Sequence, residues 1–410
     1  MSLRAKQRLV FASLLLAVGG LYVWSTYQFF TRLVPGGNDF LCHYSLWQAV
    51  ARYHLNPYSD EALHYTQLAI YGRAARPDED PNILVYPFYS VLVYGPFIVF
   101  DYAFARALFM TLLQAAVIGG VVLTLGVVGW RPPPWLTAVL TLWAVLNYHE
   151  ARAVLIGQFA PLGFFALAGA LWLLKQKRDG WAGLLMILPT VKPTLVYLII
   201  PVLLLWALAR RRWRFILGLG GGILALCLVS FVALPSWFGD WLHRVSGYSG
   251  YRATQGVLWQ LTHIAFPALG QTGEVALAAG LVGALAWQWW RVIRGGHDVD
   301  AEFLWALGAT AVVSFVIDAH TATPNYVLMI IPTFQVCAML DRRLGRGGRF
   351  WIVLVLLGML VGHWWLHFIT VIGNAEQAAV FLPWPIVLSV ALVLCRRWLV
   401  ADHRPAQVAL

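Results

Sequence analysis

Several polar side chains of this sequence stand beside long apolar runs, where an ionised group is costly. Asp39 follows the first apolar run in the stretch GGND, and Lys192 separates two short apolar runs. Asp318 and His320 lie together between two further runs, where Asp318 could hold the imidazole ring of His320 in one tautomer. We expect His320 to share a cavity with Asp39. Ionisable groups at membrane depth usually face a pathway or a reaction site. A carboxylate in such a place can act as a general base, and a lysine or histidine can bind an anionic leaving group.

Each of these residues also has a purely structural interpretation. Asp39 could cap a helix, because GGND is a favourable helix start. Lys192 could extend its ammonium group to the membrane interface, and His320 could be a loop histidine with satisfied hydrogen bonds. A fourth polar residue, Gln158 in the stretch LIGQFAPLGFF, could join two helices by a hydrogen bond.

The composition identifies the class of protein that must position these residues. Of 410 residues, 60% are hydrophobic and 11% are charged, whereas a soluble domain has about 25% charged residues. The net charge of +11 comes from short basic clusters between apolar runs, which is the positive-inside pattern of membrane proteins and does not indicate nucleic-acid binding. The four cysteines form no CxxC pair, so neither a disulfide framework nor a zinc site is indicated. We predict an all-α polytopic membrane protein.

Apolar runs of suitable length recur along the chain, and we predict about twelve membrane-spanning helices in one domain over residues 1–410. They cover residues 9–30, 84–100, 106–129, 153–173, 181–192, 194–209, 215–234, 275–292, 303–317, 326–340, 350–368 and 383–399. The first is a retained signal anchor, because it lacks an A-x-A cleavage site. Residues 135–147 are expected to form a short helix that does not span, and TVKPT should break the pair of short runs around Lys192.

The basic connections fix the expected orientation. The clusters at 175–178, 210–214, 291–297 and 341–349 should be cytoplasmic, as should both termini. The large loops 31–83 and 235–274 then lie outside, and they form the side that carries Asp39 and the other candidate residues. The first of these loops has apolar residues at near-helical spacing, which predicts two amphipathic helices at the interface. These residues are Leu46, Ala49, Val50, Tyr53, Leu63, Leu68 and Ile70.

An ordered set of motifs resembles a known family. The stretch DFLCHYSLWQAVARYHLNPY resembles the opening of the polyprenyl-phosphate-mannose-dependent mannosyltransferases in the GT-C glycosyltransferase superfamily. VYPFYSVLVYGP is similar to their YPP segment, with Phe88 at the place of the second proline. GQFAPLGFF, the segment around TVKPT and the following RRRWR match the family in the same order. The chain thus looks like an α-1,2-mannosyltransferase of the phosphatidylinositol-mannoside type.

The resemblance is weaker at HTATPNYVLMIIP. The family has a His–Tyr pair in this segment, whereas this chain has Asn325 and Tyr326 there and a histidine, His320, five residues earlier. Either His320 or the Asn325–Tyr326 pair could therefore fill the family position.

The resemblance implies an inverting transfer of a sugar, mannose in this family, from a polyprenyl phosphate to a lipid or glycan acceptor outside the cytoplasm. Asp39 would be the general base and His320 a second catalytic residue. The expected substrate-binding residues are Lys192, Gln158, Arg252, His43, Tyr44, Tyr86, Asn325 and Tyr326. No cofactor is expected besides the donor substrate, and dependence on a divalent metal is left open.

The remaining expectations concern partners and the competing functions. We expect a monomer in the plasma membrane that contacts membrane lipids, the lipid-linked sugar donor and a glycolipid or glycan acceptor, with no nucleic acid. The main alternative is a lipid or sugar transporter, which would show half-repeats and broken helices near the bilayer midplane. A noncatalytic membrane assembly protein is a second alternative, and it would need no concave polar cavity around Asp39.

Overall fold

The computed structural model describes residues 3–77, 79–248, 255–320, 322–371 and 376–401. Within these residues the regular structure is helical, and the one β-type pairing is an isolated bridge between Gln255 and His320. This confirms the prediction of an all-α protein.

The chain divides into two compact units. Unit 1 comprises Met1–Ala115, Ala153–Phe159 and Ser230–Tyr248, and unit 2 comprises Ala116–Arg152, Ala160–Val229 and Ser249–Leu410. The chain passes between the units within α5 (Tyr102–Val128), α7 (Tyr148–Ile156) and α11 (Trp213–Ala233). A single domain over residues 1–410 stays a prediction.

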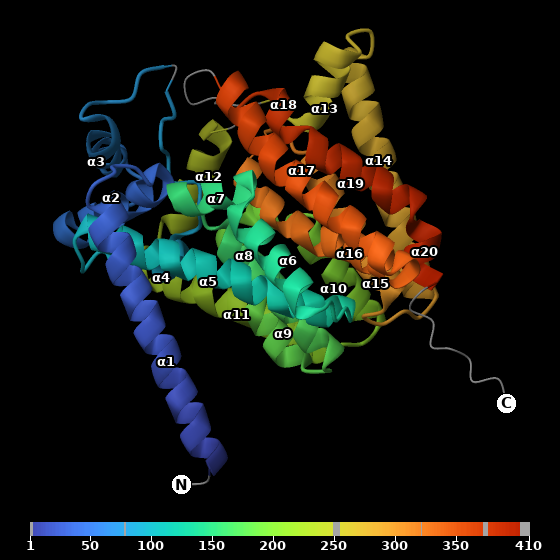
Figure 1. The fold of residues 1–410 in the computed structure, drawn as a ribbon. Coiled ribbons are helices and arrows are strands. Elements are labelled where there is room, and N and C mark those ends of the chain that lie inside the picture. The colour runs from blue at the N-terminus through green and yellow to red at the C-terminus, as the bar shows by residue number, and fades with distance from the viewer. Residues whose placement is uncertain (1–2, 78, 249–254, 321, 372–375, 402–410) are drawn as a thin grey trace, which may run out of the picture. The chain divides into compact units, whose positions relative to one another are not determined.

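Unit 1 contains α1 (Leu3–Thr26), α2 (Asn38–Tyr53), α3 (Asp60–Tyr71), α4 (Val91–Tyr94) and α12 (Trp237–Tyr248). Helices α2 and α3 pack against each other, and they are the two helices predicted from the spacing of apolar residues in the first large loop (Figure 1). Helix α3 begins where the Ser59 side chain accepts a hydrogen bond from the Ala62 N–H at 3.2 Å. It ends at Gly72, which adopts the left-handed conformation.

The core of unit 1 is aromatic. The Phe40 ring stacks on Phe109 with centroids 4.6 Å apart and also contacts the rings of Phe97 and Tyr102. Phe40 and Phe109 are fully buried. Stacked and edge-on rings add to the stabilisation that comes from burying their area, so this cluster anchors the start of α2 against α5.

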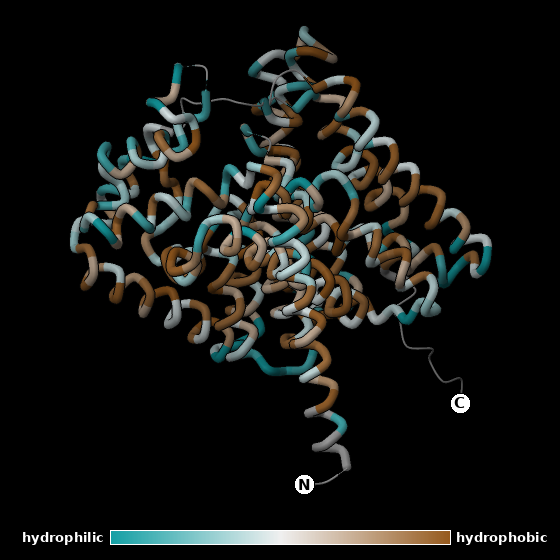
Figure 2. The backbone as a smooth tube through the Cα atoms, turned by 60° about the vertical axis from the view of Figure 1, so that its left-hand side comes forward, coloured by the Kyte–Doolittle hydropathy of each residue, from teal (hydrophilic) through white to brown (hydrophobic). Residues whose placement is uncertain are grey.

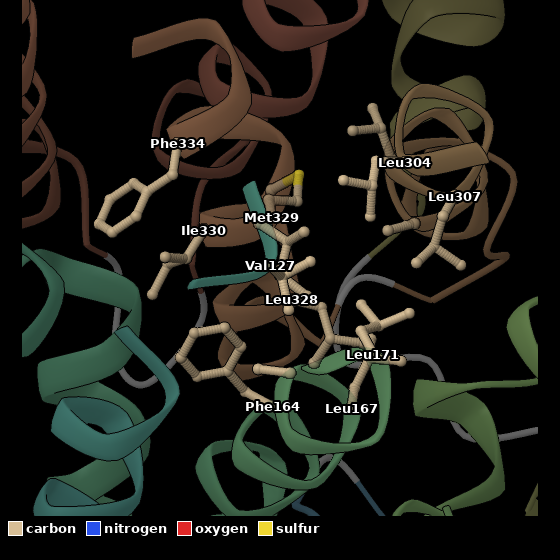
Figure 3. Packing of buried hydrophobic residues seen from close by; sticks show 14 of the residues in the cluster. Val127, Phe164, Leu167, Leu171, Leu304, Leu307, Leu328, Met329, Ile330 and Phe334 are labelled. Carbon is tan, nitrogen blue, oxygen red and sulfur yellow. The ribbon is translucent and has the colours of Figure 1, made fainter. Parts of the chain in front are cut away.

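Unit 2 is a larger helical bundle. It contains α6 (Pro134–Leu146), α8 (Ala160–Lys175), α9 (Asp179–Leu185), α10 (Ile199–Ala209), α13 (Val257–Trp259), α14 (Gly270–Arg294), α15 (Ala301–Val316), α16 (Ile330–Leu344), α17 (Arg346–Thr370), α18 (Ala378–Phe381), α19 (Pro383–Leu394) and α20 (Arg396–Ala401). Figure 1 shows α16, α17 and α19 side by side. Figure 3 shows part of the core of this unit, with leucine, isoleucine and phenylalanine side chains from α8, α15 and α16 together with Val127 of α5 and with Leu328 and Met329 of the 3₁₀ segment Thr323–Met329.

The described residues contain six helices that are long and apolar enough to span a membrane, or seven if the bent pair α7 and α8 is one span. The six are Val10–Thr31, Tyr102–Val128, Trp213–Ala233, Gly270–Arg294, Thr323–Leu344 and Arg346–Thr370. The prediction of twelve spans is therefore wrong in number, although the protein has the spans of a membrane protein. In Figure 2 hydrophobic residues run along most of the helical tube, whereas hydrophilic residues gather mainly at loops and helix ends.

The excess came from apolar runs whose helices are too short to count as candidate spans. The predicted spans at 84–100, 181–192, 194–209, 303–317 and 383–399 fall on apolar helices of 10–17 residues. Hydropathy counts apolar residues and does not record where a proline ends a helix. At TVKPT the predicted break is confirmed, because short 3₁₀ segments at Leu188–Val191 and Pro193–Leu195 separate α9 from α10. Residues 135–147 are likewise helical, as α6.

Candidate active site

Asp39 lies in the first turn of α2, which begins at Asn38 immediately after two glycines. Gly36 and Gly37 have φ angles of 139° and 79°, and the Tyr102 hydroxyl donates a hydrogen bond to the Gly36 carbonyl oxygen at 2.6 Å. A Cβ atom on Gly37 would come within 2.7 Å of Arg106 Nε, so the turn needs glycine. It starts α2 and leaves Asp39 partly buried at a helix N-terminus, which favours its negative charge.

Gln158 binds the Asp39 carboxylate. Its Nε2 donates a hydrogen bond to Asp39 Oδ2 at 2.6 Å. Its Oε1 accepts from the Tyr86 hydroxyl at 3.0 Å and from the Phe159 backbone N–H at 2.9 Å. Two donors on Oε1 orient the amide so that its NH₂ group faces Asp39. The Asp39 side chain therefore makes a tertiary contact, and Gly37, not Asp39, occupies the cap position of α2.

Gly157 lets the preceding backbone approach α2 closely. It has a φ angle of 75°, and a Cβ atom on it would lie 2.4 Å from Phe40 Cβ. Any larger residue would push the segment away from α2, and Gln158 with it. The two residues of the GQ motif therefore act together. Gly157 lets the backbone approach α2, and this approach brings Gln158 within hydrogen-bond distance of Asp39.

The segment that carries Tyr86 is held by residues that sequence reasoning did not select. The Tyr58 hydroxyl donates to the Tyr86 carbonyl oxygen at 2.9 Å, and Trp241 Nε1 of α12 donates to the Val85 carbonyl oxygen at 2.9 Å. Arg244 Nε of α12 donates to the Tyr58 carbonyl oxygen at 2.6 Å. The NPY motif at residues 56–58 was the available sequence signal for Tyr58, whereas its partners on α12 carried none.

A second hydrogen bond ties the NPY motif to α12. Asn56 Nδ2 donates to Asp240 Oδ2 at 2.7 Å. Hydrogen bonds from Ser236 and Asn56 lower the pKa of Asp240 below its usual value. Asp240 is therefore ionised at neutral pH, and it holds the motif from the side of α12.

His43 and Tyr44, both predicted to bind substrate, have different surroundings. His43 lies one helical turn after Asp39, and its ring stacks on Tyr86 and Tyr94 with centroids 4.7 Å and 4.0 Å away. It therefore joins the Asp39 cluster through Tyr86. The Tyr44 hydroxyl donates to the Phe100 carbonyl oxygen at 2.8 Å, a contact that anchors α2.

Lys192 lies between the two 3₁₀ segments of unit 2. Its Nζ donates a hydrogen bond to Asn325 Oδ1 at 2.8 Å, and the two residues are 6% and 1% exposed. A lysine that extends to the interface keeps its ammonium group in water, whereas this ammonium group is buried against a protein amide. The contact pairs two residues that the sequence predicted as substrate-binding.

Asp318 contacts the main chain of His320. Its Oδ1 accepts the His320 backbone N–H at 3.2 Å, whereas we had expected it to hold the imidazole ring. Burial raises the pKa of Asp318 above its usual value, although this hydrogen bond and the charge interactions with His320 and Lys192 act in the opposite direction. Among the described residues, no hydrogen-bond partner reaches His320 Nε2.

Tyr326, the other half of the alternative pair, lies in the core of unit 2. It is 1% exposed, and its hydroxyl donates to the Phe381 carbonyl oxygen at 3.2 Å. Its ring contacts those of His149, Phe315 and Trp384. Packing in this core therefore explains why a large aromatic residue stands at position 326.

Unit 2 also holds a buried ionic network that the sequence did not reveal. Glu376, with a side chain 5% exposed, pairs with Arg152 Nη1 at 2.8 Å. The Tyr148 hydroxyl donates to Glu376 Oε1 at 2.5 Å, and Thr323 Oγ1 donates to Oε2 at 2.7 Å. Tyr148 and Glu376 are 228 residues apart in the sequence, so local patterns carried no signal for this pairing.

The structure thus gathers Asp39, Gln158, Tyr86 and His43 in unit 1, and Lys192 and Asn325 in unit 2. His320 belongs to unit 2, so its sharing a cavity with Asp39 stays a prediction. Arg252 lies outside the described residues.

Comparison with known proteins identifies a family whose model matches this chain. The model of glycosyltransferase family 87 matches residues 84–319, which is more than half of the chain. The match includes Tyr86, Gln158 and Lys192, whereas Asp39 precedes it and His320 follows it. No curated protein and no solved structure gives a significant match.

Proposed function

The chain belongs to glycosyltransferase family 87 and is a membrane glycosyltransferase of the GT-C type, and we propose that it transfers mannose from a polyprenyl-phosphate donor to a hydroxyl group of a lipid or glycan acceptor. The proposal includes inversion at the anomeric carbon and a site on the extracytoplasmic side of the plasma membrane. The contact between Gln158 and Asp39 carries the proposal, because it joins a family-matched residue to the carboxylate that the sequence selects as general base.

The residues around Asp39 suit proton transfer. As the acceptor oxygen forms its bond to the anomeric carbon, the bond from that carbon to the phosphate oxygen breaks, and the acceptor proton moves to Asp39. The Gln158 hydrogen bond to Oδ2 and the chain through Tyr86 and Tyr58 hold the carboxylate in one orientation. An oriented base of this kind typically contributes about 10²–10⁴-fold in rate.

The leaving group is a lipid-linked phosphate, which leaves with the electron pair of the broken bond and needs positive charge beside it. Lys192 is our candidate, because its ammonium group is buried and held by Asn325. We assign supporting roles to His320 and Arg252. Asn325 then acts as a positioning residue that orients the ammonium group.

The direct test uses the purified full chain in lipid nanodiscs with polyprenyl-phosphate [¹⁴C]mannose and a crude glycolipid extract as acceptor. We expect labelled glycolipid and an equal amount of released polyprenyl phosphate. The transporter alternative predicts a different result, namely donor that crosses a liposome bilayer with its sugar still attached. That outcome, with no labelled product, would replace the proposal.

Replacing Lys192 by alanine should weaken donor binding by about 10–100-fold, because a charge-assisted hydrogen bond to phosphate contributes roughly 1.5–3 kcal/mol. Lys192→Arg should recover part of the affinity, since the charge is kept but the donor geometry differs. The measurement is a titration with polyprenyl phosphate. Lys175→Ala is the matched control, because Lys175 binds the Val127 carbonyl oxygen in the predicted cytoplasmic cluster. Unchanged affinity in Lys192→Ala would assign the lysine a structural role.

A further inference from the structure

The C-terminal end of α14 carries a cationic, aromatic cavity in unit 2. The cavity has a volume of about 380 Å³, and Trp290, Arg291, Arg294, His297 and Glu302 are among its lining residues. Helix α14 is one of the candidate spans, and only 22% of its apolar stretch is buried by the rest of the chain. The cavity therefore lies where a peripheral spanning helix ends.

The acidic residues at this cavity have partners other than Arg291 and Arg294. Glu302 accepts a hydrogen bond from Gln288 Nε2 at 3.1 Å and pairs with Arg396 at 3.1 Å. Asp300 pairs with His297 Nδ1 at 2.8 Å and caps α15 through the Phe303 N–H. Among the described residues no carboxylate forms an ion pair with Arg291 or Arg294. Their positive charges are therefore available to an anion.

The guanidinium groups are arranged for a ligand at the lipid boundary. Arg294 lies over the Trp290 ring, 4.8 Å from its centroid, and such stacking fixes the direction of a guanidinium group. Trp290 stacks in turn on Trp287 with centroids 4.7 Å apart. A third cation is close, because Arg210 Nη1 lies 3.4 Å from the position that a Cβ atom on Gly296 would take.

The exposed face of α14 continues the site towards the hydrocarbon region. Trp287 is 59% exposed and Trp290 is 44% exposed, and tryptophan at a helix end is typical of the headgroup level of a bilayer. Val275 and Val282, which lie two turns apart on one side of the same helix, are also exposed. An acyl chain can lie along these residues while a phosphate sits among the arginines. Free phosphate would use only the arginines and leave the apolar path empty.

We propose that this cavity binds the phosphate headgroup of an anionic phospholipid, held by Arg291 and Arg294, with the acyl chains along α14. Basic pockets between spanning helices on the cytoplasmic side are suited to such headgroups. The sequence places the connection 291–297 on that side by the positive-inside rule. The site is separate from the residues assigned to sugar transfer, and it does not depend on that assignment.

The test is native mass spectrometry of the full chain in detergent, titrated with phosphatidylglycerol or phosphatidylcholine. We expect tighter binding of phosphatidylglycerol. The double variant Arg291→Gln/Arg294→Gln should bind it about 30-fold more weakly, and Arg294→Gln alone about fivefold more weakly. Both arginines are exposed, so the variants should fold, and their apparent melting temperature checks this.

The matched control is Arg214→Gln/Arg346→Gln, which removes the same charge from exposed positions in two other basic clusters. It should change the affinity by less than about threefold. Equal affinity for both lipids, or an equal loss in the control, would show that charge alone attracts the lipid and would overturn the proposal. Displacement of phosphatidylglycerol by equimolar inorganic phosphate would overturn it too, because the site would then recognise free phosphate.

Discussion

Asp39→Asn is expected to lower the turnover of sugar transfer by about 10²–10⁴-fold, the contribution of a positioned general base. Asparagine keeps an oxygen that can accept the hydrogen bond from Gln158 Nε2, which now lies 2.6 Å from Asp39 Oδ2. The orientation of the side chain is thus kept, and only its ability to take a proton is lost. Donor affinity and the apparent melting temperature should stay close to those of the parent protein.

The measurement is kcat in nanodiscs, with donor binding and melting recorded on the same samples. Glu61→Gln is the matched control, because Glu61 lies in the first turn of the neighbouring α3 with an exposed side chain. It should leave kcat unchanged. A kcat of Asp39→Asn within about threefold of the parent value would remove Asp39 from the role of base.

Gln158→Leu separates orientation from proton transfer. It removes the hydrogen bond to the carboxylate but leaves the carboxylate itself, so kcat should fall by about tenfold, less than in Asp39→Asn. A loss as large as that of Asp39→Asn would mean that Gln158 takes part in the chemistry directly.

The sequence predicted best those features that depend on nearby residues. The periodic apolar residues of the first loop predicted α2 and α3, and the prolines around Lys192 predicted the break between α9 and α10. Both signals act within a few residues, where helix propensity and proline sterics decide the structure. The number of spans was wrong because apolar runs such as 84–100 form only short helices, here Phe88–Phe97.

The residues of the candidate site were predictable from the sequence, whereas their contacts were not. Asp39, Gln158 and Lys192 were found because each is a polar residue where an apolar one would cost less. Which residues they contact was not predictable, because Asn325 meets Lys192 from 133 residues away. The contact of Asp318 with the His320 backbone, in place of its ring, also depends on local geometry that residue types do not encode.

The second large effect concerns the network around Glu376. Arg152→Met should lower the free energy of unfolding by about 3 kcal/mol, because it leaves a buried carboxylate without its counter-ion. Glu376→Gln should cost less, since a neutral amide still accepts hydrogen bonds from the Tyr148 and Thr323 hydroxyls and Arg152 is 29% exposed to water. The double variant should lose less than the sum of the two, as expected for residues in contact.

These energies can be measured by titration with sodium dodecyl sulfate, followed by tryptophan fluorescence. Lys177→Met is the control, because Lys177 pairs with Asp298 at the surface, where the two side chains are 66% and 37% exposed, so its loss should cost no more than about 1 kcal/mol. If Arg152→Met is no more destabilising than Lys177→Met, the buried pair does not stabilise unit 2 as argued.

The same variant has a consequence for donor binding. Thr323, which binds both Arg152 and Glu376, begins the 3₁₀ segment Thr323–Met329 that carries Asn325, the partner of Lys192. Loss of the network should loosen this segment and misplace Asn325. We therefore expect Arg152→Met to weaken polyprenyl-phosphate binding by about fivefold even where the protein is fully folded, whereas Lys177→Met should not. Normal donor affinity in folded Arg152→Met would confine the network to a structural role.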